Sequence, residues 1–470
     1  MLPTPKNYAI WPSVIEADKE TALTIIPTEK SFLFLEDKEY SVTVVHVNID
    51  ETNYAHPNNH VTFPVTPEDG IITFSYFFPD EQEHTIVLNV NGKPAYNFYV
   101  YSLREDLYAL RPLKGDLHAH SYRSDGRRDP SALAGYYREY GYDFFALTDH
   151  NRYYPGEEID DNYKDVKLAF QRVKGEEVHV PGNSVHIVHV GGKSSVADLY
   201  VHDREKYEAE LETYIPKVPS DIPEKYVTRY AQCMWATDKI HEAGGLAIFP
   251  HPYWRPSLSK AFNVCDEFAT ILLKSGMFDA YELIGGMKQI GNNRSVALWG
   301  EVRASGVDIP VVGSSDVHGI EKSDEFPHLF TICFAAERSN DAIIDAVRNG
   351  MSVAVESCGT AYDRQHRCYG SLRLVSYAQF LLSRFFPQQM RICQGEGIAM
   401  RNYSMDLCGA EVIELQAKVS ESFALRFFGK EPPILPSDDV KAFTAKWREV
   451  QLSGPATKGS HVDGPVNRQL

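Results

Sequence analysis

The sequence predicts a chain of the α/β class, in which an all-β domain precedes a larger part where strands and helices alternate. Residues from about 20 to 105 contain strand-like segments separated by turn signals, and no helical period interrupts them. From about residue 112, apolar strands are followed by polar residues and then by helical segments. Histidines and carboxylates gather where these strands end, which is where barrels and open α/β sheets carry their sites.

The first part, residues 1–107, is predicted to be a small antiparallel β-sandwich of immunoglobulin-like type. Its β-branched and aromatic segments lie at residues 23–26, 40–47, 71–77 and 84–90. Turn residues such as those of Pro67–Gly70 and Asn91–Lys93 lie between them. We expect this domain to supply no metal ligand.

The second part, residues 108–358, carries start and stop signals for helices between its strands. Asp129 caps a helix that Gly141 ends, and Gly244 ends a helix that begins near Tyr226. Because strands follow these helices, we expect parallel strands with crossover helices. Residues 193–225 are expected to form a polar insertion outside the core.

The third part, residues 359–470, is predicted to be a C-terminal extension that is partly helical. Residues 371–386 are apolar enough for a packed helix, and Glu411–Leu415 suits either a helix or a strand. From Leu452 on, the chain is rich in Gly, Pro and Ser, which predicts a loose tail.

The composition bounds the functional classes. At 470 residues with a net charge of −17, the chain has room for two or three domains and lacks a broad basic groove for long nucleic acid. Its seven cysteines are scattered singly, which argues against a disulfide framework and a thiolate zinc site. No signal peptide is visible, and no apolar run approaches the roughly 20 residues that span a bilayer. We therefore expect a cytoplasmic protein without a membrane partner.

The most informative stretch is residues 115–126, GDLHAHSYRSDG. His118 and His120 lie one residue apart on a predicted strand, so their side chains point to the same face and can reach one metal ion together. The Ser-Asp-Gly turn that follows folds the chain back and keeps Asp125 nearby, which adds a carboxylate ligand.

The same arrangement recurs where other apolar runs end, at Thr148–Asn151, Phe249–Pro252 and Ser314–Gly319. The candidate metal ligands are His118, His120, Asp125, His150, Glu177, His186, His251, Asp316 and His318. Histidine nitrogen and carboxylate oxygen without cysteine suit zinc, manganese or iron in a hydrolytic site. Nine ligands are too many for one ion but suit two or three ions that share a bridging carboxylate.

In combination, these motifs resemble those of the PHP (polymerase and histidinol phosphatase) family. The motifs are GDLHAHSYRSDG, ALTDHN, Gly175–Glu177, AGGLAIFPHP and VVGSSDVHG, in that order. The resemblance covers roughly residues 112–356, about half of the chain. It implies a distorted (β/α)7 barrel with a two- or three-metal site for phosphoester hydrolysis.

The resemblance also implies how the ligands divide among the metals. The first metal is expected on His118, His120, Glu177 and Asp316, the second on Glu177, His186 and His251, and the third on Asp125, His150 and His318. Two choices remain open at this point, because Glu176 is a rival of Glu177 and His189 is a rival of His186.

The expected catalytic residues are His120, Glu177, Asp316 and Arg255. The family has an arginine after its His-Pro that helps to hold phosphate, and here Tyr253 and Trp254 precede Arg255. The expected reaction is attack of a metal-bridging hydroxide on the phosphorus of a phosphomonoester or a small nucleotide or oligonucleotide. The alternatives are a metal-dependent hydrolase of another ester or amide, and a non-catalytic module that binds glycan or protein.

Overall fold

The computed structural model describes residues 7–49, 59–320, 325–358 and 365–453. These residues form two compact units, one from residues 1–109 together with 421–470, and the other from residues 110–420. The tail expected beyond Leu452 lies almost entirely outside the described residues. No helix in the described ranges is both long enough and apolar enough to cross a bilayer.

The first unit contains two β-sheets in its described part. One sheet has the order β1 (Tyr8–Trp11), β3 (Lys19–Pro27) and β6 (Ile72–Phe78). The other has the order β2 (Val14–Glu16), β8 (Lys93–Leu103), β7 (Gln82–Val90), β4 (Tyr40–His46) and β5 (His60–Val65). Neighbouring strands are antiparallel except for β2 and β8. Buried residues of both sheets, among them Leu23 and Val42, form one hydrophobic core. The immunoglobulin-like type of this unit stays a prediction.

The end of the chain packs on these strands. The amide of Ser13 donates to the carbonyl of Phe427 at 3.0 Å, and Trp11 meets Phe423 edge to face at 5.9 Å between ring centroids. The helical elements assigned wholly to this unit are the short η1 (Lys30–Phe32) and α1 (Glu105–Tyr108) and the longer α13 (Asp438–Ser453). Residues 365–420 group instead with the α/β unit, so the expected C-terminal extension is divided between the two units.

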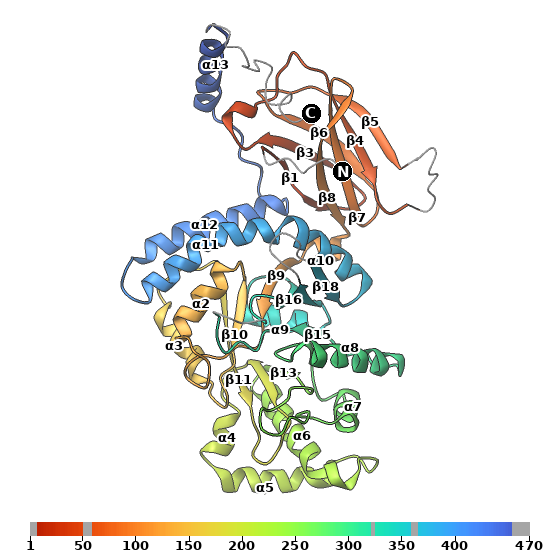
Figure 1. The fold of residues 1–470 in the computed structure, drawn as a ribbon, viewed down its shortest axis with the longest axis vertical. Helices are drawn as coiled ribbons and strands as arrows, with labels where there is room; N and C mark the ends of the chain where they lie inside the picture. Colours follow the sequence, from red (N-terminus) through yellow and green to blue (C-terminus); the bar gives the residue numbers. More distant parts are fainter. Residues whose placement is uncertain (1–6, 50–58, 321–324, 359–364, 454–470) are drawn as a thin grey trace. The chain divides into compact units, whose positions relative to one another are not determined.

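The second unit is built on a ten-stranded sheet, counted over the described residues, with the order β15-β14-β13-β12-β11-β10-β9-β16-β17-β18 (Figure 1). These strands are β9 (Arg111–Asp116), β10 (Phe144–Leu147), β11 (Gln171–Val178), β12 (Ile187–Gly191), β13 (Gly245–Phe249), β14 (Ala280–Ile284), β15 (Val311–Gly313), β16 (Leu329–Ala335), β17 (Ser352–Cys358) and β18 (Gln365–Tyr369). The sheet curls, because β15 also contacts β16 and β17. There the amide of Gly313 donates to Thr331 Oγ1 at 3.0 Å, and Ser352 Oγ donates to the carbonyl of Val311 at 2.9 Å.

The expectation of parallel strands holds for β9, β10 and β11 and for β13, β14 and β15. It is wrong for β12, and also for β16 and β17, which are antiparallel to their neighbours. β12 is antiparallel to both of its neighbours. β11 ends at Val178 and β12 begins at Ile187, and so short a connection has no room for a crossover helix. The reversal places the start of β12, and not its end, at the edge where the parallel strands end.

Helices accompany the strands of this unit, and a side chain caps the start of some of them. They are α2 (Pro130–Glu139), α3 (Tyr154–Asn162), α4 (Ala197–Val201), α5 (Arg204–Tyr214), η2 (Ile215–Lys217), η3 (Glu224–Tyr226), α6 (Val227–Glu242), α7 (Asp266–Lys274), α8 (Gln289–Ala304), α9 (Asn340–Arg348), α10 (Leu372–Arg384), α11 (Phe386–Tyr403) and α12 (Ala410–Phe427). Asp129 caps α2 by accepting from the amides of Ser131 and Ala132. Gly141 follows with a φ of 77°, which favours glycine.

Residues 193–225 differ from the expected polar insertion. Tyr200 of α4 and Tyr207 of α5 are buried and lie in one hydrophobic core with Trp235 of α6. The ring centroids of Tyr207 and Trp235 are 4.8 Å apart. The segment therefore contributes to the core of the unit. Its composition looks polar because most charged residues of α5 face solvent and outnumber the buried apolar ones.

Two glycines allow α2 and α11 to approach closely (Figure 1). A Cβ atom on Gly397 of α11 would overlap the backbone nitrogen of Glu139 and the carbonyl oxygen of Gly135 on α2. Next to this contact, the buried guanidinium of Arg138 donates from Nε to Glu396 Oε2 at 2.7 Å. The close approach and the ion pair hold α11 to the α/β unit.

Gly397→Ala should therefore destabilise the protein, because backbone atoms cannot move aside as a flexible side chain would. Overpacking of this kind costs about 1–3 kcal/mol of the free energy of unfolding. Gly300, within α8, is the matched control, since a Cβ atom there meets nothing within 4 Å. Gly300→Ala should raise the free energy of unfolding by about 0.5–1 kcal/mol. Urea unfolding followed by circular dichroism compares the two, and equal effects would contradict this account.

Candidate metal centre

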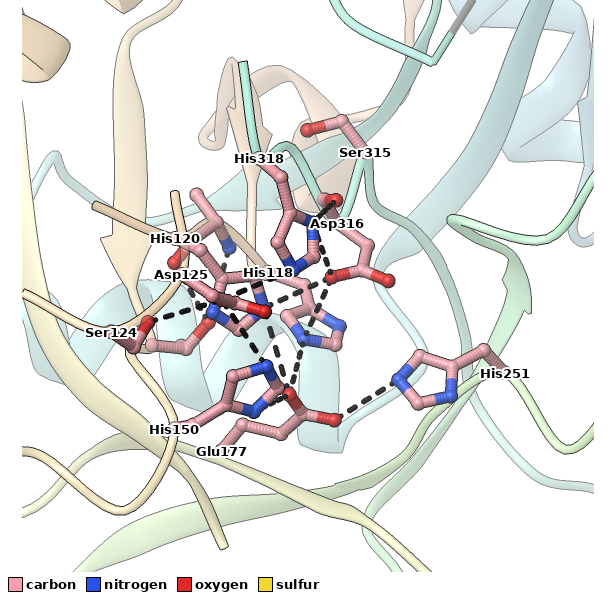
Figure 2. Close-up of polar contacts among 12 residues, drawn as sticks. His118, His120, Ser124, Asp125, His150, Glu177, His251, Ser315, Asp316 and His318 are labelled. Atoms are coloured by element: carbon pink, nitrogen blue, oxygen red, sulfur yellow. Dashed lines mark hydrogen bonds and ion pairs between the residues drawn. The ribbon is translucent and has the colours of Figure 1, made fainter. Parts of the chain in front are cut away.

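The strand ends of the second unit bring the predicted ligands together (Figure 2). His118 and His120 follow β9, and Glu177 is the second-last residue of β11. His251 follows β13, and Asp316 follows β15. The reversed β12 places His186 directly before its first residue, at the same edge. All nine predicted ligands lie in groups whose donor atoms are within 4.8 Å of one another.

Glu177 lies at the middle of this arrangement and is fully buried. Its Oε1 is 2.7 Å from His186 Nδ1 and 3.0 Å from His251 Nε2. Its Oε2 is 2.7 Å from His150 Nδ1 and 3.4 Å from His118 Nε2. One carboxylate therefore faces imidazoles on both of its oxygens, which is the geometry that a bridging ligand needs.

Asp316 is the second central carboxylate. Its Oδ1 is 2.9 Å from His120 Nε2 and 3.4 Å from His118 Nε2. The residue has a φ of 50°, and its amide donates to the carbonyl of His118 at 2.9 Å. This unusual backbone conformation turns the carboxylate toward the two histidines.

A more exposed group lies beside these two carboxylates. Asp125 Oδ1 is 3.4 Å from His150 Nε2 and 3.2 Å from His318 Nε2. The side chains of Asp125 and His318 are 54% and 41% exposed, whereas that of His118 is buried. The centre is therefore open to solvent on the side of Asp125 and His318.

Several buried potential ligand atoms at this centre form no well-aligned hydrogen bond within the described part of the chain, although imidazole and carboxylate atoms lie as close as 2.7 Å. They are His118 Nε2, His120 Nε2, Glu177 Oε2 and Asp316 Oδ1. Such atoms are costly to bury unless something else satisfies them. Imidazole nitrogen and carboxylate oxygen are ligands of zinc, manganese and iron, so these residues fit a divalent cation.

Neighbouring side chains hold the ligands in place. Glu282, in the middle of β14, accepts from His118 Nδ1 at 2.9 Å, which leaves His118 Nε2 to face the centre. Asp116 accepts from the amide of Ser315 at 3.0 Å and from the hydroxyl of Tyr137 at 2.8 Å. Burial raises the pKa of Asp116 to about 6. Carboxylates that orient metal-binding histidines in this way are typical of metal sites.

Asp149 fixes the turn that carries Asp125. It accepts from the amide and hydroxyl of Ser121, at 2.9 and 2.7 Å, and from the amide and hydroxyl of Ser124, at 3.1 and 2.5 Å. Its carboxylate is thus occupied by the turn, whereas His150 beside it faces Glu177 (Figure 2).

Two histidines of the centre hold protons tightly in the metal-free protein. Burial opposes the charge on His118, but Asp316 and the other carboxylates around it raise the pKa of His118 well above its ordinary value. Burial also opposes the charge on His150, but Asp125 and Glu177 raise the pKa of His150 to about 10. Both side chains are therefore protonated on both ring nitrogens, and positively charged, at neutral pH.

The pKa values of the two central carboxylates and of two further histidines are lowered instead. Burial favours the neutral acid, but His186 and His118 outweigh it and hold the pKa of Glu177 well below its ordinary value. The pKa of Asp316 is likewise lowered by the histidines despite burial. Burial lowers the pKa of His120 and of His186 to about 4. These two are neutral and ready to coordinate.

The rivals left open by the sequence lie apart from this cluster. Glu176 Oε1 is 3.3 Å from His189 Nδ1 and accepts from the amide of Val196 at 2.5 Å. Glu176 Oε2 accepts from Ser195 Oγ at 2.8 Å. Glu176 and His189 thus tie α4 to the sheet, because alternation along β11 and β12 turns them to the opposite face from Glu177.

Arg255 does not join the cluster among the described residues. It is exposed, and its guanidinium lies 4.6 Å from the ring centroid of Phe262. Trp254 lies closer, with its ring centroid 6.0 Å from that of His186. The side chain of Arg127 lies against Gly319, the residue after His318. The assignment of Arg255 to phosphate stays a prediction.

The sequence analysis missed His179 at this centre. His179 Nε2 is 3.4 Å from Glu177 Oε2. A signal was present, since His179 follows Glu177 by two residues and therefore shares its face of the strand, as His118 and His120 share theirs.

No family model and no curated protein matches this chain. Solved structures similar to it include a two-domain Bacteroides vulgatus protein that contains a predicted PHP-like metal-dependent phosphoesterase, with 20% identity and a TM-score of 0.37 over 52% of this chain. The match spans 65% of that protein, less than two thirds of its length. A candidate metal-dependent phosphoesterase from Bifidobacterium adolescentis matches 45% of this chain and 91% of its own, with 17% identity and a TM-score of 0.33.

An amidohydrolase from Chromobacterium violaceum, with bound sulfate and no metal, matches 45% of this chain and 89% of its own, with 16% identity and a TM-score of 0.29. All three TM-scores are below 0.5. The function proposed below therefore depends on the geometry of the centre.

Metal binding should release protons, because His118 and His150 must become neutral before they can coordinate. Since their pKa values are raised, protons compete more strongly as the pH falls, and the apparent affinity for Zn²⁺ or Mn²⁺ should increase from pH 6 to pH 8. Isothermal titration calorimetry at pH 7 in buffers of different ionisation enthalpy measures the protons released. At least one per chain is expected, and binding without release would show that these histidines are neutral.

Proposed function

We propose that this chain is a metal-dependent phosphoesterase that hydrolyses a phosphomonoester or a small nucleotide or oligonucleotide. The observation that carries the proposal is the convergence of nine histidine and carboxylate side chains on one centre, with buried potential ligand atoms that form no well-aligned hydrogen bond among the described residues. A set of this chemistry suits two or three hard or borderline divalent ions, either Mn, Zn or Fe.

We also propose that the α/β unit is a distorted (β/α)7 barrel of PHP type. The succession of β9 to β15 and the contacts of β15 with β16 and β17 support this fold. The antiparallel β12 supports the distortion. The two sheets with a common core support an immunoglobulin-like sandwich in the first unit.

The proposed ligand sets are those that the resemblance implies, and the short distances among their side chains support them. His118, His120, Glu177 and Asp316 would hold one ion, Glu177, His186 and His251 a second, and Asp125, His150 and His318 a third. Divalent ions bound at such a centre lower the pKa of coordinated water and neutralise phosphoryl oxygens. Glu177 serves both buried sites because its two oxygens face different histidines.

The remaining roles belong to the protein around the ligands. Glu282 fixes the tautomer of His118 by accepting from Nδ1. Asp116 ties the end of β9 to the segment that carries Asp316, since it accepts from the amides of both His118 and Ser315. Substrate reaches the centre from the side of Asp125 and His318, where the ligands are exposed.

We propose a small phosphorylated substrate and no long nucleic acid, since the net charge is −17. All seven cysteines lie in described ranges and are free, which agrees with the reducing environment of the cytoplasm.

A panel of substrates tests the reaction. The Mn²⁺- or Zn²⁺-loaded protein should hydrolyse an aryl phosphate or a short nucleotide, and chelation should abolish this turnover. Preference for carboxylic esters or amides would favour the other hydrolase, and preference for long duplex DNA would overturn the proposed substrate class. A fully metal-loaded protein that turns over nothing would favour a binding module.

Glu177→Gln tests the bridging role. Removing the charge of a carboxylate that serves two sites should weaken metal binding by at least about 100-fold, and activity should fall with it. Residues that only hydrogen-bond to metal ligands cost about 10- to 100-fold when they are changed, and a direct ligand should cost more. Glu176→Gln is the matched control, because this neighbouring carboxylate is equally buried but bonds to Ser195 and Val196. Elemental analysis after dialysis gives the metal content. Full occupancy in Glu177→Gln would reject Glu177 as the bridge.

Arg255→Ala and Arg127→Ala identify the cation that holds phosphate. A charge-assisted contact contributes about 1.5–3 kcal/mol, so its loss should lower kcat/KM roughly 10- to 200-fold and leave the metal content intact. The prediction assigns this loss to Arg255. If Arg127→Ala shows the loss and Arg255→Ala does not, phosphate is bound on the side of His318.

A further inference from the structure

His179 lies at the metal centre without belonging to any of the three ligand sets. Its Nε2 is 3.0 Å from His150 Nδ1 and 3.4 Å from Glu177 Oε2. The same Oε2 is 2.7 Å from His150 Nδ1. Two imidazole nitrogens and one carboxylate oxygen therefore converge on a single point beside the assigned sites.

His179 is held in this position by its backbone and by its ring. Its amide donates to Asn151 Oδ1 at 2.7 Å, and the hydroxyl of Tyr200, on α4, donates to the same oxygen at 2.6 Å. The amide of Asn151 donates in turn to the carbonyl of Glu177 at 2.9 Å. The ring of His179 stacks on that of His186 with 3.7 Å between centroids and 24° between planes. A surface histidine without a role needs none of these supports.

The short distance between His150 Nδ1 and His179 Nε2 requires a positive charge or a proton between the two nitrogens. Two imidazole nitrogens 3.0 Å apart repel each other if both present lone pairs, unless a proton or a cation lies between them. The carboxylate oxygen Oε2 of Glu177 faces the same point, 2.7 Å from His150 Nδ1 and 3.4 Å from His179 Nε2. A cation that replaces the proton of His150 can be coordinated by all three atoms at once.

His150 links this point to the exposed site. Its Nε2 faces Asp125 at 3.4 Å, while its Nδ1 faces Glu177 and His179. A neutral imidazole has one lone pair, so His150 can coordinate on one side at a time.

We propose that His150, Glu177 and His179 form an additional divalent-cation position, with His179 Nε2 as a direct ligand. The proposal rests on the metal binding proposed above and not on the identity of the substrate. It adds an N₂O donor set that suits Zn²⁺, Mn²⁺ or Fe²⁺. Because His150 is common to both positions, a cation here and one on Asp125 and His318 exclude each other.

The test first removes the competing position. The Asp125→Ala/His318→Ala protein, loaded with Zn²⁺ by equilibrium dialysis, should retain as many equivalents as the unaltered chain, because the third ion moves to His179. Adding His179→Ala should remove one equivalent or weaken it by at least about 100-fold. His202→Ala in the same background is the control, since His202 is an exposed histidine at the end of α4.

Zn²⁺ anomalous diffraction from crystals of the Asp125→Ala/His318→Ala protein locates the ion directly. A peak about 2.1 Å from His179 Nε2 is expected. If His179→Ala or His179→Gln leaves the metal content of this background unchanged, or if no peak lies near His179, the proposal is overturned. An unaltered chain that binds no metal would instead reject the proposed function, so the two failures are distinguishable.

Discussion

The structure of the α/β unit depends on the burial of one charged group, the carboxylate of Glu177. A carboxylate without water costs several kcal/mol unless opposite charge or hydrogen bonds replace its solvation. Here imidazoles face both of its oxygens, at 2.7 Å for His186 and for His150. They come from separate strand ends, so the folding of the whole unit is needed to satisfy this one side chain.

The reversal of β12 solves a geometric problem at this centre. A parallel strand has its C-terminal end at the site and needs a long crossover connection before it. The antiparallel β12 instead has its N-terminal end at the site. The short connection from Val178 to Ile187 therefore keeps both Glu177 and His186 at one edge. The opposite faces of these same strands carry Glu176 and His189, which anchor α4. Two adjacent residues of one strand thus perform two tasks because side chains alternate.

Much of this could be predicted from local sequence. The His118-x-His120 spacing and the polar residues after each apolar run indicated which side chains would meet, because period-two alternation and strand ends are local properties. The direction of β12, the pairing of His118 with Glu282 and the place of His179 depend on contacts between distant segments, so propensity did not reveal them. The prediction for residues 193–225 was wrong because α5 has few apolar residues, among them Tyr207 and Leu211, and many charged ones.

The hydrogen bonds of Asp149 have a further consequence, which concerns entropy and rate. Ordering the backbone of one residue costs roughly 1–2 kcal/mol, and a loop that ordered only when a cation arrived would subtract that cost from its affinity. The bonds from Asp149 to Ser121 and Ser124 order the turn during folding. Asp125 is thus presented on a rigid frame while its own side chain remains half exposed. An incoming ion therefore meets a turn that is already ordered, so its binding depends on loss of its water and of the proton on His150 and not on rearrangement of the turn.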